Sequence, residues 1–203
     1  MTHPACVLWR HTALLYRVAS HDIAARYAGS VLGAGWLVLQ PVVVLGIYAA
    51  VYLYIFRVQV PGLSPVQYVF YVYAGLAPFL MTAEALSLAV TSLYAGRFVL
   101  TSGAFPLELL PPKAVLVSQG AMAVGFTVIA VGSAVTGTLV WTVVLFPALW
   151  GLYVLGLIGL AWVLSIVYLV FRDLPQLVAV GLMLVLVASP IAYTPEMVPK
   201  IMA

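Results

Sequence analysis

Few side chains in this sequence could do chemistry, and they do not form a catalytic pattern. The three histidines, His3, His11 and His21, all lie within the first 21 residues, and no H-E-x-x-H zinc motif occurs. A G-x-S-x-G nucleophile turn is likewise absent from the sequence. Cys6 is the only cysteine, which excludes an intrachain disulfide and a thiolate metal cluster. We therefore predict no enzyme activity and no catalytic, cofactor-binding or metal-binding residue.

The sequence also lacks a phosphate-binding loop of the G-x-x-x-x-G-K-[ST] type. Both lysines, Lys113 and Lys200, follow a proline rather than a glycine. If ATP drives this protein, we expect a separate polypeptide to bind the nucleotide and its magnesium ion.

Glu84 is the only charged residue well inside a long apolar segment. A carboxylate in a membrane span costs free energy, so such a residue is by default a functional candidate. One interpretation is an ion relay or a substrate contact. The other is a structural glutamate that is hydrogen-bonded to neighbours such as Thr82 or Ser87.

The composition indicates that these residues are set in a membrane protein. Hydrophobic residues make up 66% of the chain and charged residues only 6%, whereas an average soluble domain is about 25% charged. The eight Lys and Arg residues are scattered rather than clustered. We therefore expect no nucleic-acid partner, and we expect the cations to lie at membrane edges near anionic lipid.

Charges and turn residues divide the apolar sequence into five predicted membrane-spanning helices, which predicts an all-α polytopic fold. The fourth is longer than a span requires, so we expect it to be tilted or broken near Pro147. The predicted spans cover residues 31–56, 68–94, 114–135, 139–171 and 174–192.

The distribution of cations predicts the orientation of the spans. With a cytoplasmic N-terminus, all Lys and Arg residues except Arg57 and Lys200 lie inside. Residues 1–30 differ from the rest, because Arg10, Arg17 and His21 share one narrow arc of a helix opposite apolar side chains. We predict a cytoplasmic amphipathic helix in the headgroup plane; packing against a partner is the alternative.

Tyr48 and Tyr52 share one face of the first predicted span. Their rings offer flat surfaces for stacking on sugars and hydroxyls for hydrogen bonding. Lipid contact or helix packing is the alternative role.

Four segments, in order along the chain, resemble the type-2 ABC exporter permeases, especially those that export O-antigen, teichoic acid or capsule polysaccharide. The first is RYAGSVLGAGWLVLQP at Arg26–Pro41, and the second is GLAPF at Gly75–Phe79. The others are FPLELLPPKAVL at Phe105–Leu116 and the region Phe171–Pro199, which contains FRDL and SPIAY.

The resemblance implies a permease in the bacterial inner membrane that pairs with a second copy of itself and with separate ABC ATPase subunits. Its substrate would be a polyprenyl-linked or free polysaccharide. By matching position, the ATPase-coupling residues would be Arg97, Phe105, Pro106, Glu108, Arg172 and Asp173. The substrate path would include Tyr48, Tyr52, Ser189, Pro190 and Tyr193.

The family's permeases usually have six spans, and we expect this sequence to lack the last one. Three alternatives to a polysaccharide exporter stay open at this point. The first is a drug or lipid exporter permease of the same superfamily. The second is a proton-coupled secondary transporter that uses Glu84, and the third is an inert membrane scaffold.

Overall fold

The structure is a computed structural model, and it describes residues 12–51, 54, 64–96, 106–137, 141–189 and 191. These residues form helices and turns, with no strand among them, so the predicted all-α class is confirmed. The α-helices are α2 (Thr12–Arg26), α3 (Trp36–Ala50), α4 (Pro65–Ala95), α6 (Leu110–Val135), α7 (Phe146–Val170) and α8 (Leu174–Ala188). Short 3-10 helices precede α3, α6 and α7, namely η1 (Gly33–Gly35), η3 (Leu107–Leu109) and η4 (Trp141–Leu145).

Four helical segments of the described chain are long and apolar enough to cross a membrane. They are Gly33–Ala50, Pro65–Ala95, Leu107–Val135 and Val143–Val170. The fifth apolar helix, α8, has 15 residues. At a rise of 1.5 Å per residue it is about 22 Å long, which is shorter than a hydrocarbon core of about 30 Å.

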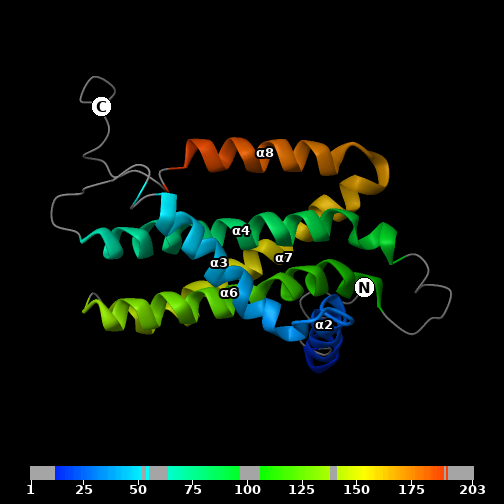
Figure 1. The fold of residues 1–203 in the computed structure, drawn as a ribbon. Coiled ribbons are helices and arrows are strands. Elements are labelled where there is room, and N and C mark those ends of the chain that lie inside the picture. The colour runs from blue at the N-terminus through cyan, green and yellow to red at the C-terminus, as the bar shows by residue number, and fades with distance from the viewer. Residues whose placement is uncertain are drawn as a thin grey trace, which may run out of the picture.

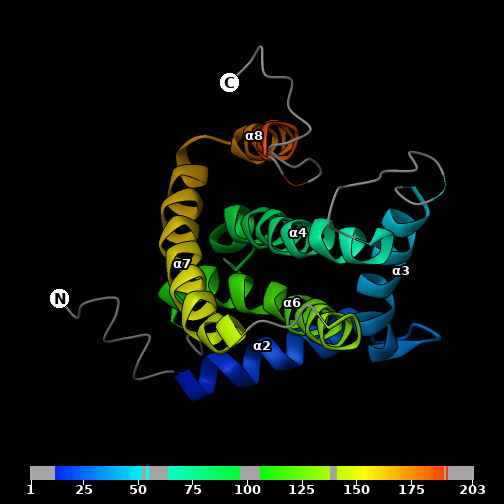
Figure 2. The same ribbon diagram turned by 90° about the vertical axis from the view of Figure 1, so that its left-hand side faces the viewer.

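Helices α4 and α6 lie side by side and run in opposite directions at the centre of the molecule (Figure 1). Figure 2 shows α3 and α7 on opposite sides of this central pair, and α8 lies next to α4. Helix α2 lies crosswise beneath α6, at one end of the bundle (Figure 2). The end of α4, the start of α6, the end of α7 and the start of α8 meet at the same end of the bundle (Figure 1).

Prolines mark the starts of the long helices. Pro65, Pro111 and Pro147 each occupy one of the first two positions of their helix, where a missing N–H breaks no intrahelical hydrogen bond. Helix α6 therefore begins at Leu110 rather than at Ala114, because its two prolines belong to the first turn and do not interrupt it. Helix α7 begins directly before Pro147, after the separate turn η4.

Small side chains let α4, α6 and α7 approach closely. Ala85 and Ala89 of α4 and Ala161 of α7 are fully buried, together with Val115 of α6. Without a hydrophobic effect between lipid and protein, such close packing is a main source of helix association.

Polar side chains add hydrogen bonds between these helices. The Trp150 indole N–H donates to Gln119 Oε1 across 2.9 Å and joins α7 to α6. The Tyr153 hydroxyl of α7 contacts Thr82 of α4 and donates to the Pro78 carbonyl across 3.3 Å. We conclude that α4, α6 and α7 form the frame on which the other helices are placed.

The outer faces of the bundle are strongly apolar. Leu149 and Leu152 of α7 and Val187 of α8 are 63%, 69% and 73% exposed. Apolar surface of this extent on a soluble protein would mark an interface, and on a bundle of span-length helices it fits contact with lipid.

Candidate functional site

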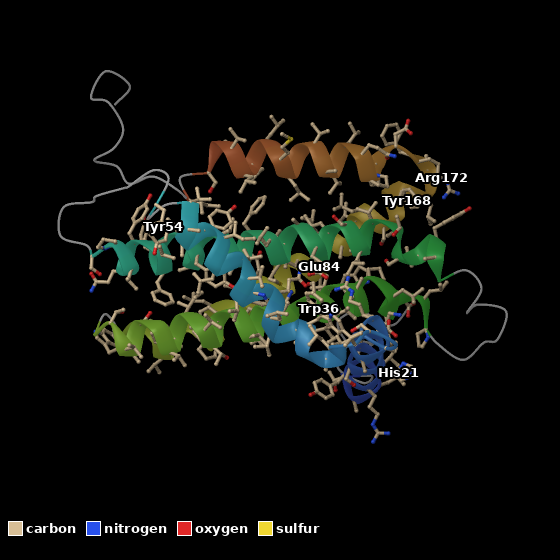
Figure 3. All side chains as sticks on the ribbon, in the orientation of Figure 1. His21, Trp36, Tyr54, Glu84, Tyr168 and Arg172 are labelled. Carbon is tan, nitrogen blue, oxygen red and sulfur yellow. The ribbon has the colours of Figure 1, made fainter. Side chains whose placement is uncertain are left out.

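The charged side chains of the described residues gather in α2 and toward one end of the bundle. Figure 3 shows His21 on α2 and Arg172 at this end, whereas Glu84 lies further along α4. The Asp, Glu, Lys and Arg residues in the described ranges are Arg17, Asp22, Arg26, Glu84, Glu108, Lys113, Arg172 and Asp173.

Two ion pairs fasten α2 to the central helices. The Arg26 guanidinium binds the Glu84 carboxylate of α4, and Lys113 Nζ of α6 lies 2.7 Å from Asp22 Oδ2. Asp22 and Arg26 have the i,i+4 spacing that predicts an ion pair within α2, but each of them pairs instead with a central helix, so this prediction is wrong. An exposed ion pair on one helix contributes only a few tenths of a kcal/mol to stability. A carboxylate in an apolar helix is costly without a partner, so pairing Arg26 with Glu84 stabilises the fold more.

Glu84 finds its partner on another helix rather than among its neighbours. The hydroxyls of Thr82 and Ser87, the neighbours considered from the sequence, donate to carbonyls of α4 itself. The hydrogen bond with Glu84 raises the pKa of the Arg26 guanidinium above its ordinary value. Arg26 is therefore charged at any physiological pH, and it ties α2 to α4 through a charged hydrogen bond.

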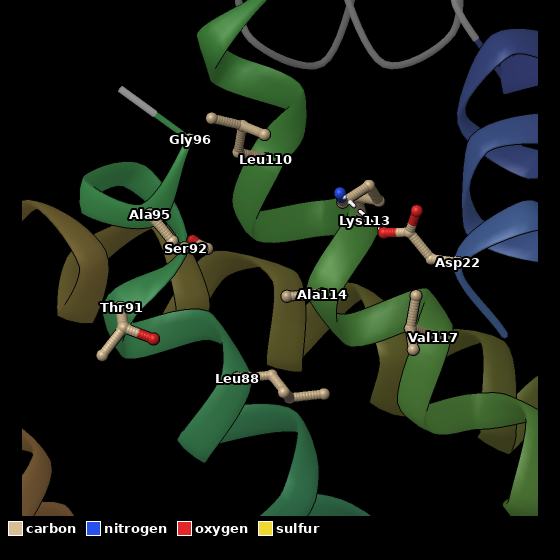
Figure 4. A pocket seen from close by; sticks show the side chains of 10 residues that line it. All are labelled: Asp22, Leu88, Thr91, Ser92, Ala95, Gly96, Leu110, Lys113, Ala114 and Val117. Atoms are coloured by element: carbon tan, nitrogen blue, oxygen red, sulfur yellow. Dashed lines mark ion pairs between the residues drawn. The ribbon is translucent and has the colours of Figure 1, made fainter. Parts of the chain in front are cut away.

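A cleft of about 340 Å³ lies where α4 ends and α6 begins, beside the second ion pair (Figure 4). Asp22 and Lys113 line one side of it, and Ser92 and Gly96 line the other. Leu110 packs so closely on Gly96 that a Cβ there would overlap its side chain. The cleft thus combines a charged edge with a tightly packed helix junction.

Arg172 joins the ends of three helices. Its guanidinium carbon lies 4.1 Å from the centre of the Tyr94 ring and 5.2 Å from that of Tyr168. The two rings meet edge to face with centroids 6.0 Å apart. Tyr94 lies in the last turn of α4, Tyr168 lies in the last turn of α7, and Arg172 lies just before α8. Cation–π attraction therefore holds these three helix ends together.

A second contact attaches α7 to the turn before α6. The Trp162 indole N–H donates to the backbone carbonyl of Glu108 across 2.8 Å. The side chain of Glu108 itself is exposed, as are those of Arg172 and Asp173. This end therefore presents charged side chains on a backbone that is fixed to the bundle.

The structure brings several of the sequence-predicted coupling residues to this one end. Pro106 and Glu108 lie at η3, and Arg172 and Asp173 form the turn between α7 and α8. Arg97 and Phe105 fall outside the described residues.

Of the predicted path residues, the structure describes Tyr48 and Ser189. Tyr48 is half-buried on α3, and Ser189 follows α8, with its N–H bonded to the Val185 carbonyl. Tyr52, Pro190 and Tyr193 lie outside the described residues. The substrate path stays a prediction.

Sequence reasoning missed the interhelical contacts of Asp22, Trp162 and Tyr94. The position of Tyr94 at the end of a span predicts a role in the aromatic belt at a membrane boundary, whereas the structure gives its ring a specific partner in Arg172. The sequence does contain a signal for the partner of Glu84. A single carboxylate in an apolar helix requires a cation, and the chain has only eight Lys and Arg residues that could supply one. In the part of the chain that the structure describes, no three His, Cys, Asp or Glu side chains lie close enough to hold a metal ion.

Span-length apolar helices with charges collected at one end define a polytopic membrane protein. No protein-family model matches the sequence. The chain is 26% identical over 187 residues to the O-antigen export system permease protein RfbA of Myxococcus xanthus, which covers 92% of this chain and 70% of that protein. Two proteins of the same name from Klebsiella pneumoniae are 27% and 26% identical over 196 residues, covering 92% of this chain and 71% of each. These similarities confirm the resemblance to the type-2 ABC permeases of polysaccharide export.

Proposed function

We propose that this chain is the membrane-spanning permease subunit of an ATP-driven exporter of surface polysaccharide. The observation that carries the proposal is the similarity to O-antigen export permeases over 92% of the chain. The substrate would be O-antigen or a related teichoic acid or capsule glycan, either lipid-linked or free. Two copies of the permease would work with two ATPase subunits that bind ATP and magnesium.

In this proposal the charged end of the bundle faces the cytoplasm of a bacterium and contacts the ATPase. Glu108, Arg172 and Asp173 present exposed charges there, on backbone held by the Trp162 and Arg172 contacts. ATP binding can change the bundle only through groups that contact the ATPase differently in its two states. Rigid attachment at this end would pass that difference to α4, α7 and α8.

The export path would run between two permease copies, along α3 and α8. Tyr48 would offer an aromatic surface to a sugar ring, and Ser189 would lie near its outer end. Aromatic rings can bind the apolar faces of successive sugars without selecting a single one, which suits a polymer that must slide.

The proposal is tested by purifying the full chain together with the ABC ATPase whose gene lies nearest to its own in the genome of origin. We expect the two proteins to co-purify, and we expect a polyprenyl-linked glycan to stimulate ATP hydrolysis in lipid nanodiscs. A hydrophobic drug of similar lipid affinity should not stimulate it. The substitution Arg172→Ala should reduce the stimulation several-fold, whereas Arg17→Ala, which changes an exposed cation of α2, should not. Lack of an ATPase partner, or hydrolysis indifferent to the glycan, would contradict the proposal.

A further inference from the structure

A cavity of about 340 Å³ lies inside the bundle between α3, α4 and α6, away from the cleft at the charged end. Small residues line part of it, namely Ala77 of α4 and Ala121 and Gly125 of α6. At about 30 Å³ per water, its volume corresponds to about eleven waters, which is large enough to hold a six-membered ring with its substituents. Its lining residues are Gln40, Pro41, Val44, Tyr73, Ala77, Leu80, Met81, Glu84, Ala121 and Gly125.

Three polar side chains converge on this cavity from two helices. Tyr73 of α4 is only 3% exposed, and its hydroxyl makes no hydrogen bond within the described residues. A Cβ at Gly125 would lie 3.3 Å from this hydroxyl, so the glycine leaves the space in front of it open. A buried hydroxyl without a hydrogen-bond partner costs free energy, which points to a ligand group that forms a hydrogen bond with it.

Gln40 and Glu84 supply the other polar groups. Gln40 is exposed at the mouth of the cavity, its amide has no hydrogen-bond partner in the part of the chain that the structure describes, and it can both donate and accept. Glu84 binds Arg26 through Oε1, so its negative charge is balanced while the carboxylate still faces the cavity. The remaining lining is apolar, which is the usual composition of a small-molecule site.

From this arrangement we infer that the cavity is a binding site for the ring of a neutral, polyhydroxylated group, that is, a sugar. A hydrocarbon chain would leave the Tyr73 hydroxyl and the Gln40 amide without partners. An anionic headgroup would find no free positive charge among the lining residues, because Glu84 is the only charged residue of the lining and Arg26 is already paired with it. A sugar ring offers hydroxyls to the three polar groups and apolar C–H faces to Pro41 and Met81.

The inference rests on the proposed function for the origin of the sugar, which could be the transported glycan or the headgroup of a membrane glycolipid. Both sources share the same ring chemistry. The site differs from the proposed export path, because it lies within one bundle rather than between two copies.

Photolabelling of the full chain in phosphatidylcholine nanodiscs tests the inference. One probe is a glucosyl diacylglycerol with a diazirine on the sugar, and a second is a polyprenyl-linked oligosaccharide with the same group on its first sugar. A phosphatidylglycerol with a headgroup diazirine is the anionic comparison. We expect at least one sugar probe to label peptides of α3, α4 or α6 that line the cavity, at least five-fold more than the anionic probe; the more active probe identifies the source.

Variants distinguish the cavity from general lipid contact. Tyr73→Phe and Gln40→Leu should each reduce the labelling at least five-fold. Tyr71→Phe is the matched control, because Tyr71 lies on α4 outside the cavity and is 47% exposed. Thermal unfolding in the same nanodiscs should be unchanged in all three variants, because each keeps a side chain of similar volume.

Equal labelling by sugar and anionic probes, or labelling that Tyr73→Phe and Gln40→Leu leave unchanged, would overturn the inference. The assay requires neither ATPase nor transport. A working exporter without this labelling would refute the site alone, whereas labelling in a protein without ATP-driven export would refute the proposed function alone.

Discussion

The ion pair between Arg26 and Glu84 should contribute measurably to the stability of the bundle. Glu84 lies about 16 Å along α4 from its end at Ala95, at 1.5 Å per residue. Two unit charges about 4 Å apart attract by about 4 kcal/mol at an effective dielectric constant of about 20. The side chains of Arg26 and Glu84 are 40% and 26% exposed, so solvent screening reduces this to a coupling energy of about 2 kcal/mol.

A double-mutant cycle measures this coupling. We expect Arg26→Met to lower the free energy of unfolding by about 3 kcal/mol, because it leaves a carboxylate without its cation in an apolar helix. Glu84→Gln should lower the free energy of unfolding by less than Arg26→Met does. The loss of stability in the double variant should be about 2 kcal/mol smaller than the sum of the losses in the two single variants. Unfolding by SDS in mixed micelles, followed by tryptophan fluorescence, provides the free energies.

The matched control is a second double-mutant cycle in which Arg17, an exposed cation on the same helix, takes the place of Arg26. Arg17→Met and Glu84→Gln should be additive within about 0.5 kcal/mol. If Arg26→Met and Glu84→Gln are equally additive, the pair does not hold α2 to α4, and the structural role assigned to Glu84 is wrong.

Three other predictions follow from the structure. Gly132→Ala in α6 should destabilise the bundle by about 1–3 kcal/mol in the same unfolding assay, because a Cβ would overlap the Phe70 ring. Gly151→Ala should leave the stability unchanged, because a Cβ there meets no other atom within 4 Å. Equal effects of the two substitutions would contradict this packing. Arg172→Lys keeps the charge but loses the planar stacking on tyrosine, so glycan-stimulated ATP hydrolysis should fall several-fold with little change in the basal rate; an unchanged stimulation would refute the coupling role. Glu84→Gln should leave ATP-driven export largely intact, and complete loss of transport in a complex that still hydrolyses ATP would count against a structural role.

The helical class and the approximate spans could be predicted from the sequence because they depend on local composition. Uncharged runs such as 31–56 are too long for anything but a span, and in lipid the backbone must satisfy its own hydrogen bonds. Helix starts were harder, because Pro111 and Pro112 serve as first-turn residues in α6 although proline usually ends a helix.

The contacts between helices could not be predicted in the same way. Arg26 and Glu84 are 58 residues apart, and nothing in local spacing selects this pair over the i,i+4 pair of Asp22 with Arg26. The cavity depends on Gln40, Tyr73 and Gly125, which come together only when three helices cross. The resemblance to a family predicts which residues would contact the ATPase, but it does not indicate which groups hold those residues in place.

ATP-driven movement of a glycan tests the central claim most directly. The full chain and its ATPase would be reconstituted in inverted vesicles with a radiolabelled polyprenyl-linked glycan on the outside. Appearance of the glycan in the lumen should require ATP and should persist when a proton uncoupler is added at constant ATP. Transport that stops with the uncoupler, or that proceeds without the ATPase, would contradict the claim that this protein is an ATP-driven exporter of polysaccharide.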